Sequence, residues 1–145
     1  MAANTQPIFP LTPKVAWATI TAANIAKDGT GNIATVFTAG ADGSRIDQIK
    51  VRPLGTNVAT VMRFFVNNGN ANTTASNNSL IHETTIAAST VSEVAALADY
   101  NITITVNTSE TAPPIPYLPA NHKINVTIGT TVSAGLQVTV HGGDY

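Results

Sequence analysis

The sequence contains no cysteine among its 145 residues. This absence excludes a disulfide framework and a thiolate zinc site, and it is compatible with assembly in a reducing cytosol. A chain of this length is near the commonest size of a single domain and buries about two-thirds of the surface that its unfolded form exposes. A hydrophobic core can therefore hold the fold without a covalent cross-link.

Charged residues are also scarce. They make up 10% of the chain, and the formal net charge is −1, whereas a typical protein has about 25% charged residues. The basic footprint of a nucleic-acid-binding protein and the polybasic patch of a lipid-binding one are both missing, so we expect no nucleic-acid or membrane partner. The low charge content has two possible explanations. Threonine suits the exposed faces of β-sheets and replaces charged residues there. Alternatively, further chains cover much of the surface, where charge is costly to desolvate.

Long apolar runs are missing as well. No stretch approaches the roughly 20 apolar residues of a membrane helix. Residues 1–7 carry neither the basic region nor the apolar run of a signal peptide, so we expect no secretion. Asn-x-Thr/Ser triplets such as Asn101-Ile102-Thr103 are then interpreted as chance in a chain rich in Asn and Thr, and not as glycan sites.

The first thirteen residues combine prolines with apolar side chains. The prolines are Pro7, Pro10 and Pro13, and the apolar residues are Ile8, Phe9 and Leu11. Prolines at this spacing exclude a helix and favour an extended N-terminal arm over residues 1–13. An arm with exposed apolar residues is either disordered or docked on a neighbouring subunit or partner.

The remainder, residues 14–145, is predicted to form one β-domain. Alternating apolar residues separated by turn residues predict eight strands. These are expected at 14–21, 32–38, 45–52, 58–66, 80–87, 101–107, 123–127 and 136–140. Ile46 is out of phase with Ile49 and Val51, which predicts a bulge near Asp47 and Gln48.

The last three predicted strands alternate strictly, which is typical of sheets covered on one face only. We therefore expect an all-β fold, an eight-stranded antiparallel sandwich of the jelly-roll type. An immunoglobulin-like sandwich is the alternative, although its cysteines are absent. Trp17 is expected in the core and residues 67–78 in a long exposed loop. Residues 90–99 fit either a short helix or an irregular link.

No catalytic constellation is recognisable, so we expect no enzyme. His82, His122 and His141 are far apart and in no ligand spacing. A glycosidase requires two carboxylates at a defined separation, and the sequence does not place Glu83 at a defined distance from either Glu93 or Glu110. A nucleophile elbow and a phosphate-binding glycine loop are both missing.

A metal or cofactor is not expected either. Asp28, Asp42 and Asp47 lie near glycine-rich turns, but turn chemistry alone explains the Asp-Gly pairs. Tyr117, in a proline-rich segment, is expected to be exposed and to serve as an interface anchor.

Several segments resemble small phage and prophage virion proteins of the capsid decoration, or cement, type. They are 7–9 (PIF), 17–24 (WATITAAN), 28–31 (DGTG), 36–47 (VFTAGADGSRID), 52–57 (RPLGTN) and 142–145 (GGDY). The resemblance implies a jelly-roll homotrimer on the outer surface of the virion, made in the host cytoplasm, that clamps adjacent major capsid subunits. It also makes Ile8, Phe9, Pro10 and Leu11 the candidate capsid contacts.

Other functions remain open at this point. The main alternative is a tail- or head-fibre jelly-roll module that binds a host glycan, which a cluster of exposed aromatic residues would favour. An enzyme domain and a single-jelly-roll major capsid protein are further alternatives.

Overall fold

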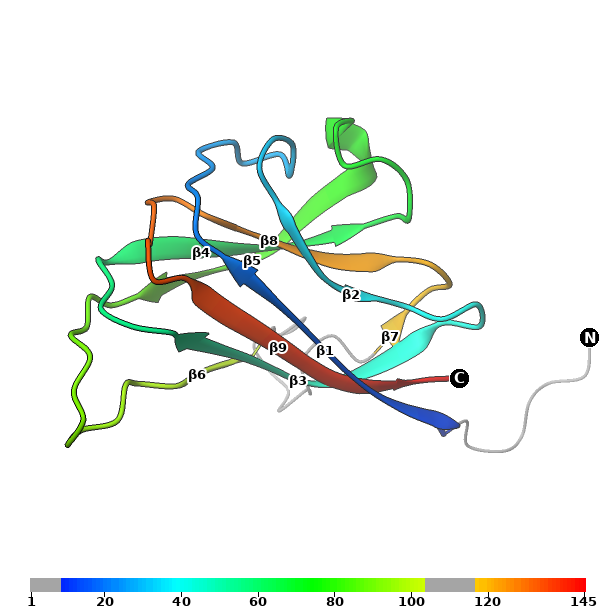
Figure 1. The fold of residues 1–145 in the computed structure, drawn as a ribbon. Coiled ribbons are helices and arrows are strands. Elements are labelled where there is room, and N and C mark those ends of the chain that lie inside the picture. Colours follow the sequence, from blue (N-terminus) through cyan, green and yellow to red (C-terminus); the bar gives the residue numbers. More distant parts are fainter. Residues whose placement is uncertain (1–8, 104–116) are drawn as a thin grey trace, which may run out of the picture.

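The computed structural model describes residues 9–103 and 117–145, which fold into two antiparallel sheets packed face to face (Figure 1). The strands are β1 (Thr12–Ile20), β2 (Ala34–Thr38), β3 (Ser44–Pro53), β4 (Thr60–Asn67), β5 (Asn78–Ile86), β6 (Tyr100–Ile102), β7 (Tyr117–Leu118), β8 (Lys123–Ile128) and β9 (Leu136–Asp144). A 3-10 turn, η1 (Ala75–Asn77), precedes β5. The predicted all-β class is confirmed, and the paired sheets are those of a β-sandwich.

The first sheet, called sheet I, has the strand order β1-β9-β3-β6, with β7 also paired to β3. The second, sheet II, has the order β2-β8-β4-β5. The first and last strands pair along the whole of β1, from Thr12 opposite Asp144 to Ile20 opposite Leu136. The segments before β1 and after β9 therefore meet at one end of sheet I.

The core lies between the two sheets, where alternate residues of each strand point inward. Its fully buried side chains include Ile49 and Val51 of β3, Phe64 of β4, Val126 of β8 and Val138 of β9. Within the described ranges no helix is long and apolar enough to span a membrane.

Several boundaries differ from the sequence-based ones. Strand β1 begins at Thr12, inside the segment expected to be an arm. The strand expected at 101–107 is present as β6, and residues 104–107 lie outside the described ranges. Strand β7 was not predicted, because two residues are too few for a visible alternation. Segment 90–99 is an irregular link without a helical turn.

The predicted bulge in β3 is confirmed. The pairing of β3 with β9 shifts register between Ile46 and Gln48. Ile46 and Ile49 are consequently both buried, while Asp47 and Gln48 between them are exposed. The extra residue thus keeps both isoleucines on the core face.

The prediction that Trp17 lies in the core is wrong. Its side chain is 64% exposed, whereas Ile20, at the end of the same strand, is buried. The inward positions of β1 are held by Ala16, Ala18 and Ile20, which pack against the core. Because side chains alternate along a strand, Trp17 shares the opposite, outward face with Val15.

The segment expected to be an exposed loop at 67–78 is more ordered than its polarity suggests. Asn67 is fully buried at the end of β4, and it donates a 2.8 Å hydrogen bond to the side chain of Asn78 at the start of β5. The Asn67 side chain also accepts a 2.9 Å hydrogen bond from the N–H of Gly69. The residues between the strands remain largely exposed, but Asn side chains replace backbone partners and fix the turn.

The outer face of sheet II is covered. Phe65, Asn125 and Thr127 point away from the core, yet they are buried. The segment 21–33 lies against this face, because Asn24 donates its N–H to the carbonyl of Ile128 and accepts a hydrogen bond from Arg63. Figure 1 shows this segment and the η1 region above β8 and β4. Among the residues that the structure describes, the outer face of sheet II is thus covered and the outer face of sheet I is open.

Candidate functional site

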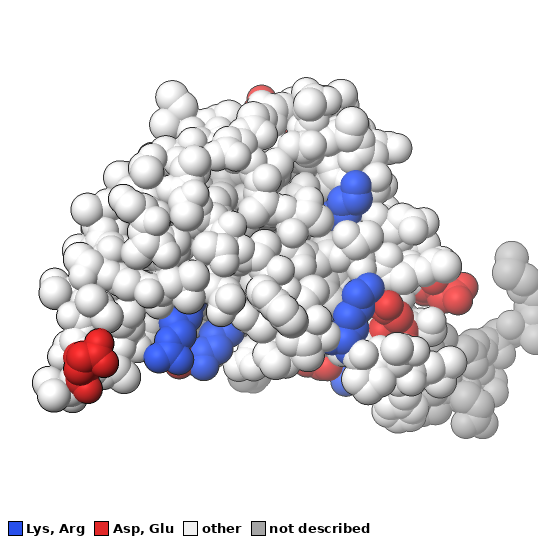
Figure 2. Space-filling model, viewed as in Figure 1, with Lys and Arg blue, Asp and Glu red and all other residues white. Residues whose placement is uncertain are grey.

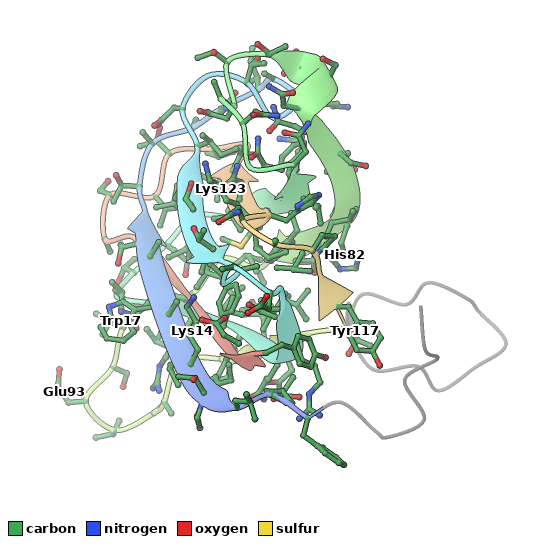
Figure 3. The ribbon with its side chains drawn as sticks, turned by 90° about the vertical axis from the view of Figure 1, so that its right-hand side faces the viewer. Lys14, Trp17, His82, Glu93, Tyr117 and Lys123 are labelled. Carbon is green, nitrogen blue, oxygen red and sulfur yellow. The ribbon has the colours of Figure 1, made fainter. Side chains whose placement is uncertain are left out.

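A row of apolar side chains on β1 is the main feature of the open face. Pro13, Val15 and Trp17 are alternate residues of this edge strand, and all three are exposed. Val15 is 51% exposed and Trp17 is 64% exposed. Figure 3 shows Trp17 pointing away from the body of the molecule. We call these three residues the β1 row.

The apolar surface continues ahead of β1. Phe9 and Leu11 are both strongly exposed, Leu11 at 85%. The N–H of Leu11 donates a 2.9 Å hydrogen bond to the carbonyl of Asp144, so this residue is fixed to the end of β9. Pro10 covers Gly143, where an added β-carbon would come within 2.6 Å of the Pro10 β-carbon. Ile8, the remaining candidate contact of the arm, lies outside the described residues.

The one charged residue of β1 is turned away from the β1 row. Lys14 Nζ lies 3.0 Å from Asp144 Oδ2 and donates a 2.7 Å hydrogen bond to the carbonyl of Thr38 on β2. The same ammonium group lies 4.9 Å from the centre of the Phe37 ring, a cation–π distance. Figure 3 shows Lys14 and Trp17 on the same strand. The exposed row therefore carries no charge of its own.

Asp144 is the centre of a small polar network that anchors β1. Burial raises the pKa of this carboxyl, but hydrogen bonds from Ser44 and Lys14, the charge of Lys14 and the N–H of Gly40 together outweigh burial and lower it. The carboxylate thus stays ionised at neutral pH. It joins Lys14 of β1 to Ser44 of β3, so the edge strand is fixed to its sheet.

The charges elsewhere on the open face are paired with one another. Lys50 and Arg52 of β3 contact Asp99 at 2.7 Å and 3.6 Å, and Arg45 contacts Asp47 at 2.7 Å. The hydrogen bond from Lys50 is the main reason that the pKa of Asp99 is lowered. Figure 2, in which β1 lies toward the viewer, shows mostly uncharged surface with scattered charged side chains, most of them in the lower half and toward the right. The charged groups near the β1 row are therefore largely compensated within the chain.

Tyr117 is exposed, as expected, but it lies at the opposite edge of sheet I. Its ring centre is 6.5 Å from that of Tyr145. The strand registers place Pro13, Gly143, Arg45 and Tyr117 in one line across the sheet. At about 4.8 Å per strand, Tyr117 is separated from the β1 row by about 14 Å. The predicted contact residues therefore form two groups and not one.

Val15 and Trp17 were missed as surface residues by the sequence interpretation. The signal that could have found them is the alternation Pro13, Val15, Trp17 in phase with exposed Leu11 and out of phase with buried Ile20. Large apolar residues at the outward-facing positions of an edge strand are typical of an interface.

The other polar candidates from the sequence lie in different parts of the sandwich. Glu83 is paired with Arg63 at 2.7 Å, and the ring of His82 packs 6.0 Å from that of Phe64. His141 is exposed on β9 opposite Val15. In residues 9–103 and 117–145, no three His, Cys, Asp or Glu side chains are grouped so that they could hold a metal ion.

Comparison of the chain with protein-family models, with curated proteins and with solved structures finds no match in any of the three. The β1 row has to be interpreted from its own chemistry.

Proposed function

We propose that the chain is a non-enzymatic structural virion protein that decorates and cements a phage capsid. It binds on the outer capsid surface between adjacent major capsid subunits, as a homotrimer. The observation that supports this proposal is the uncharged apolar surface formed by Phe9, Leu11 and the β1 row on the open face of sheet I.

This surface has the chemistry of a protein-binding site. It includes an exposed tryptophan on a strand that an ion pair holds in place, and tryptophan is prominent among residues that dominate binding energy. Neighbouring charges are paired within the chain, so binding does not leave an uncompensated charge buried. A flat β-surface of this kind suits another protein surface better than a small ligand, which prefers a concave site.

The strand pairing supports a jelly roll as the type of sandwich. The antiparallel pairs β1 with β9, β2 with β8, β3 with β6 and β7, and β4 with β5 are nested like the two arms of one long hairpin. Rolling that hairpin places β9 beside β3 and β8 beside β4, which are the two remaining pairs. On this interpretation β6 and β7 are two parts of one strand. In an immunoglobulin-like sandwich the first and last strands belong to different sheets.

The capsid as partner comes from the sequence resemblance, whose segments include 17–24, which begins at Trp17. Decoration also agrees with the physics of the surface. A trimer repeats each contact three times, so that a small contact surface becomes long-lived through avidity. A protein that binds only the assembled shell stabilises that shell by mass action.

The test is co-sedimentation with purified, undecorated shells of the virus that encodes the chain. The full chain and Val58→Lys, a control at 52% exposure away from the β1 row, should pellet with the shells. Trp17→Lys and the double variant Phe9→Ala/Leu11→Ala should remain in the supernatant. If the full chain does not pellet, the capsid proposal is wrong. If all variants pellet equally, another surface binds.

The glycan-binding alternative is favoured by one observation, the exposed ring of Tyr117 beside that of Tyr145. Aromatic faces of this kind stack on apolar sugar surfaces. A glycan array probed with the full chain and with Tyr117→Ala distinguishes the two functions. Glycan binding that the substitution abolishes would support the fibre module.

A further inference from the structure

We propose that β1 is also a self-association edge. Two copies pair antiparallel through their β1 strands about a two-fold axis, which joins two copies of sheet I into one continuous sheet. The proposal goes beyond capsid binding and does not depend on it.

The first argument is the regularity of β1 compared with the other sheet edges. The pairing of β2 shifts register between Thr35 and Phe37, and that of β5 with β4 shifts between Phe64 and Phe65. The other edge of sheet I consists of the short strands β6 and β7. Bulges and short strands are the devices by which proteins prevent edge-to-edge pairing. Strand β1 has nine continuous pairs with β9 and no bulge.

The second argument is that β1 from Val15 to Ile20 lacks the residues that normally protect an edge. The protecting residues are confined to the start of the strand. Pro13 removes one N–H there, and Lys14, which lies on the inner face, has its ammonium group bound to Asp144 and to the carbonyl of Thr38. The six residues from Val15 to Ile20 contain neither a charged residue nor a proline.

The third argument is that the strand is complementary to itself. When two β1 strands pair antiparallel over their whole length, Ala16 of one copy lies opposite Ala16 of the other. In this register Val15 of each copy lies opposite Trp17 of the second copy. Pairs of an aromatic with a β-branched residue are among the favourable cross-strand pairs. The same register places Lys14 opposite Ala18, so the two ammonium groups are not directly opposed.

This contact is distinct from the one that forms a trimer. A two-fold contact uses the same surface on both copies, whereas a three-fold contact joins two different surfaces. Pairing through β1 therefore makes a dimer of single chains or links two trimers. In either case the assembly contains an even number of chains.

The experiment is sedimentation equilibrium of the purified chain without capsids. We expect a mass that is an even multiple of the 15.0 kDa chain. Val15→Lys should halve this mass, while Val58→Lys, at 52% exposure against 51% for Val15, should leave it unchanged. A monomer, a trimer, or a mass that Val15→Lys does not alter would overturn the proposal.

The single tryptophan of the chain provides a second readout that needs no variant. Trp17 is exposed in the isolated chain and packs beside Val15 of the second copy in the pair, so its emission should move to longer wavelength on dilution, at the concentration where the mass halves. An emission maximum that stays constant while the mass halves would place the contact away from β1. Capsids are absent from both measurements, so a negative result would reject self-association through β1 and leave the capsid proposal unaffected.

Discussion

Lys14 on the first strand and Asp144 on the last strand form an ion pair, with 3.0 Å between Nζ and Oδ2. The two residues are 130 positions apart in the sequence. Asp144 also accepts a hydrogen bond from Ser44, so one carboxylate connects β1, β9 and β3. The strand that carries the β1 row is thereby held in a fixed position.

Asp144→Ala should lower the free energy of unfolding by about 2 kcal/mol, because it removes charge-assisted hydrogen bonds and leaves Lys14 without its carboxylate. Urea unfolding at neutral pH, followed by circular dichroism, measures the change. Glu93→Gln is the control, since Glu93 is exposed and forms no ion pair among the residues that the structure describes. Equal losses for the two variants would show that the network adds nothing to stability.

Stability should decrease in acid, and Asp144 should account for part of the decrease. Its pKa in the folded chain is lowered from the ordinary value of 3.8, so the unfolded chain binds more protons at acidic pH. The stabilisation is complete above the ordinary pKa and is lost as the pH falls through the lowered one, between about pH 5 and pH 2. Asp28 and Asp99, whose pKa values are also lowered, act in the same direction. Urea titrations across this range should show a shallower pH dependence for Asp144→Ala than for the unaltered chain, and parallel curves would contradict the assignment.

The two outer faces should respond differently to loss of an aromatic residue. Phe65 on sheet II is fully buried although it points away from the core. Phe65→Ala should therefore cost about 3–5 kcal/mol, whereas Trp17→Ala on sheet I should cost less than about 1 kcal/mol. Thermal and urea unfolding at low protein concentration provide both values. Similar losses would mean that the two faces are equally covered.

Asn24 should hold the cover of sheet II in place. Its side chain donates 2.7 Å hydrogen bonds to the carbonyls of Thr30 and Asn32 and accepts one of 2.9 Å from the N–H of Ala26. Asn24→Ala should lower the free energy of unfolding by about 2–3 kcal/mol, since the buried Asn24 side chain makes three hydrogen bonds that the alanine cannot replace. Hydrogen exchange of the amides in 24–33 should accelerate. The exposed Asn70→Ala serves as the control and should change neither quantity.

The sequence was sufficient for the fold class and for local detail that depends on phase. The position of Ile46 relative to Ile49 predicted the bulge, because only an extra residue returns both to one face. The same alternation could not say which face of β1 is the inner one. Trp17 was assigned to the core as an aromatic residue in an alternating strand, while the inner face is formed by Ala16, Ala18 and Ile20.

The candidate surface was predictable only in part. Phe9 and Leu11 were recognisable as apolar residues beside prolines, but their proximity to β9 depends on the pairing of the two end strands. The cover of sheet II depends on contacts such as Arg63 with Asn24, which are 39 positions apart. Local periodicity contains no information on such pairs.

The antiparallel pairing of β1 with β9 places Thr12 beside Asp144, so the segment before β1 and the segment after β9 leave from the same end of these two strands. A stretching force applied to those two segments would act across the strands, along their inter-strand hydrogen bonds. The bonds would then open one after another, beginning at the ion pair of Lys14 with Asp144, and would not resist as a group. The sandwich should therefore be mechanically weak when it is pulled by its two ends, and a load applied to the outer face of sheet I should be borne much better.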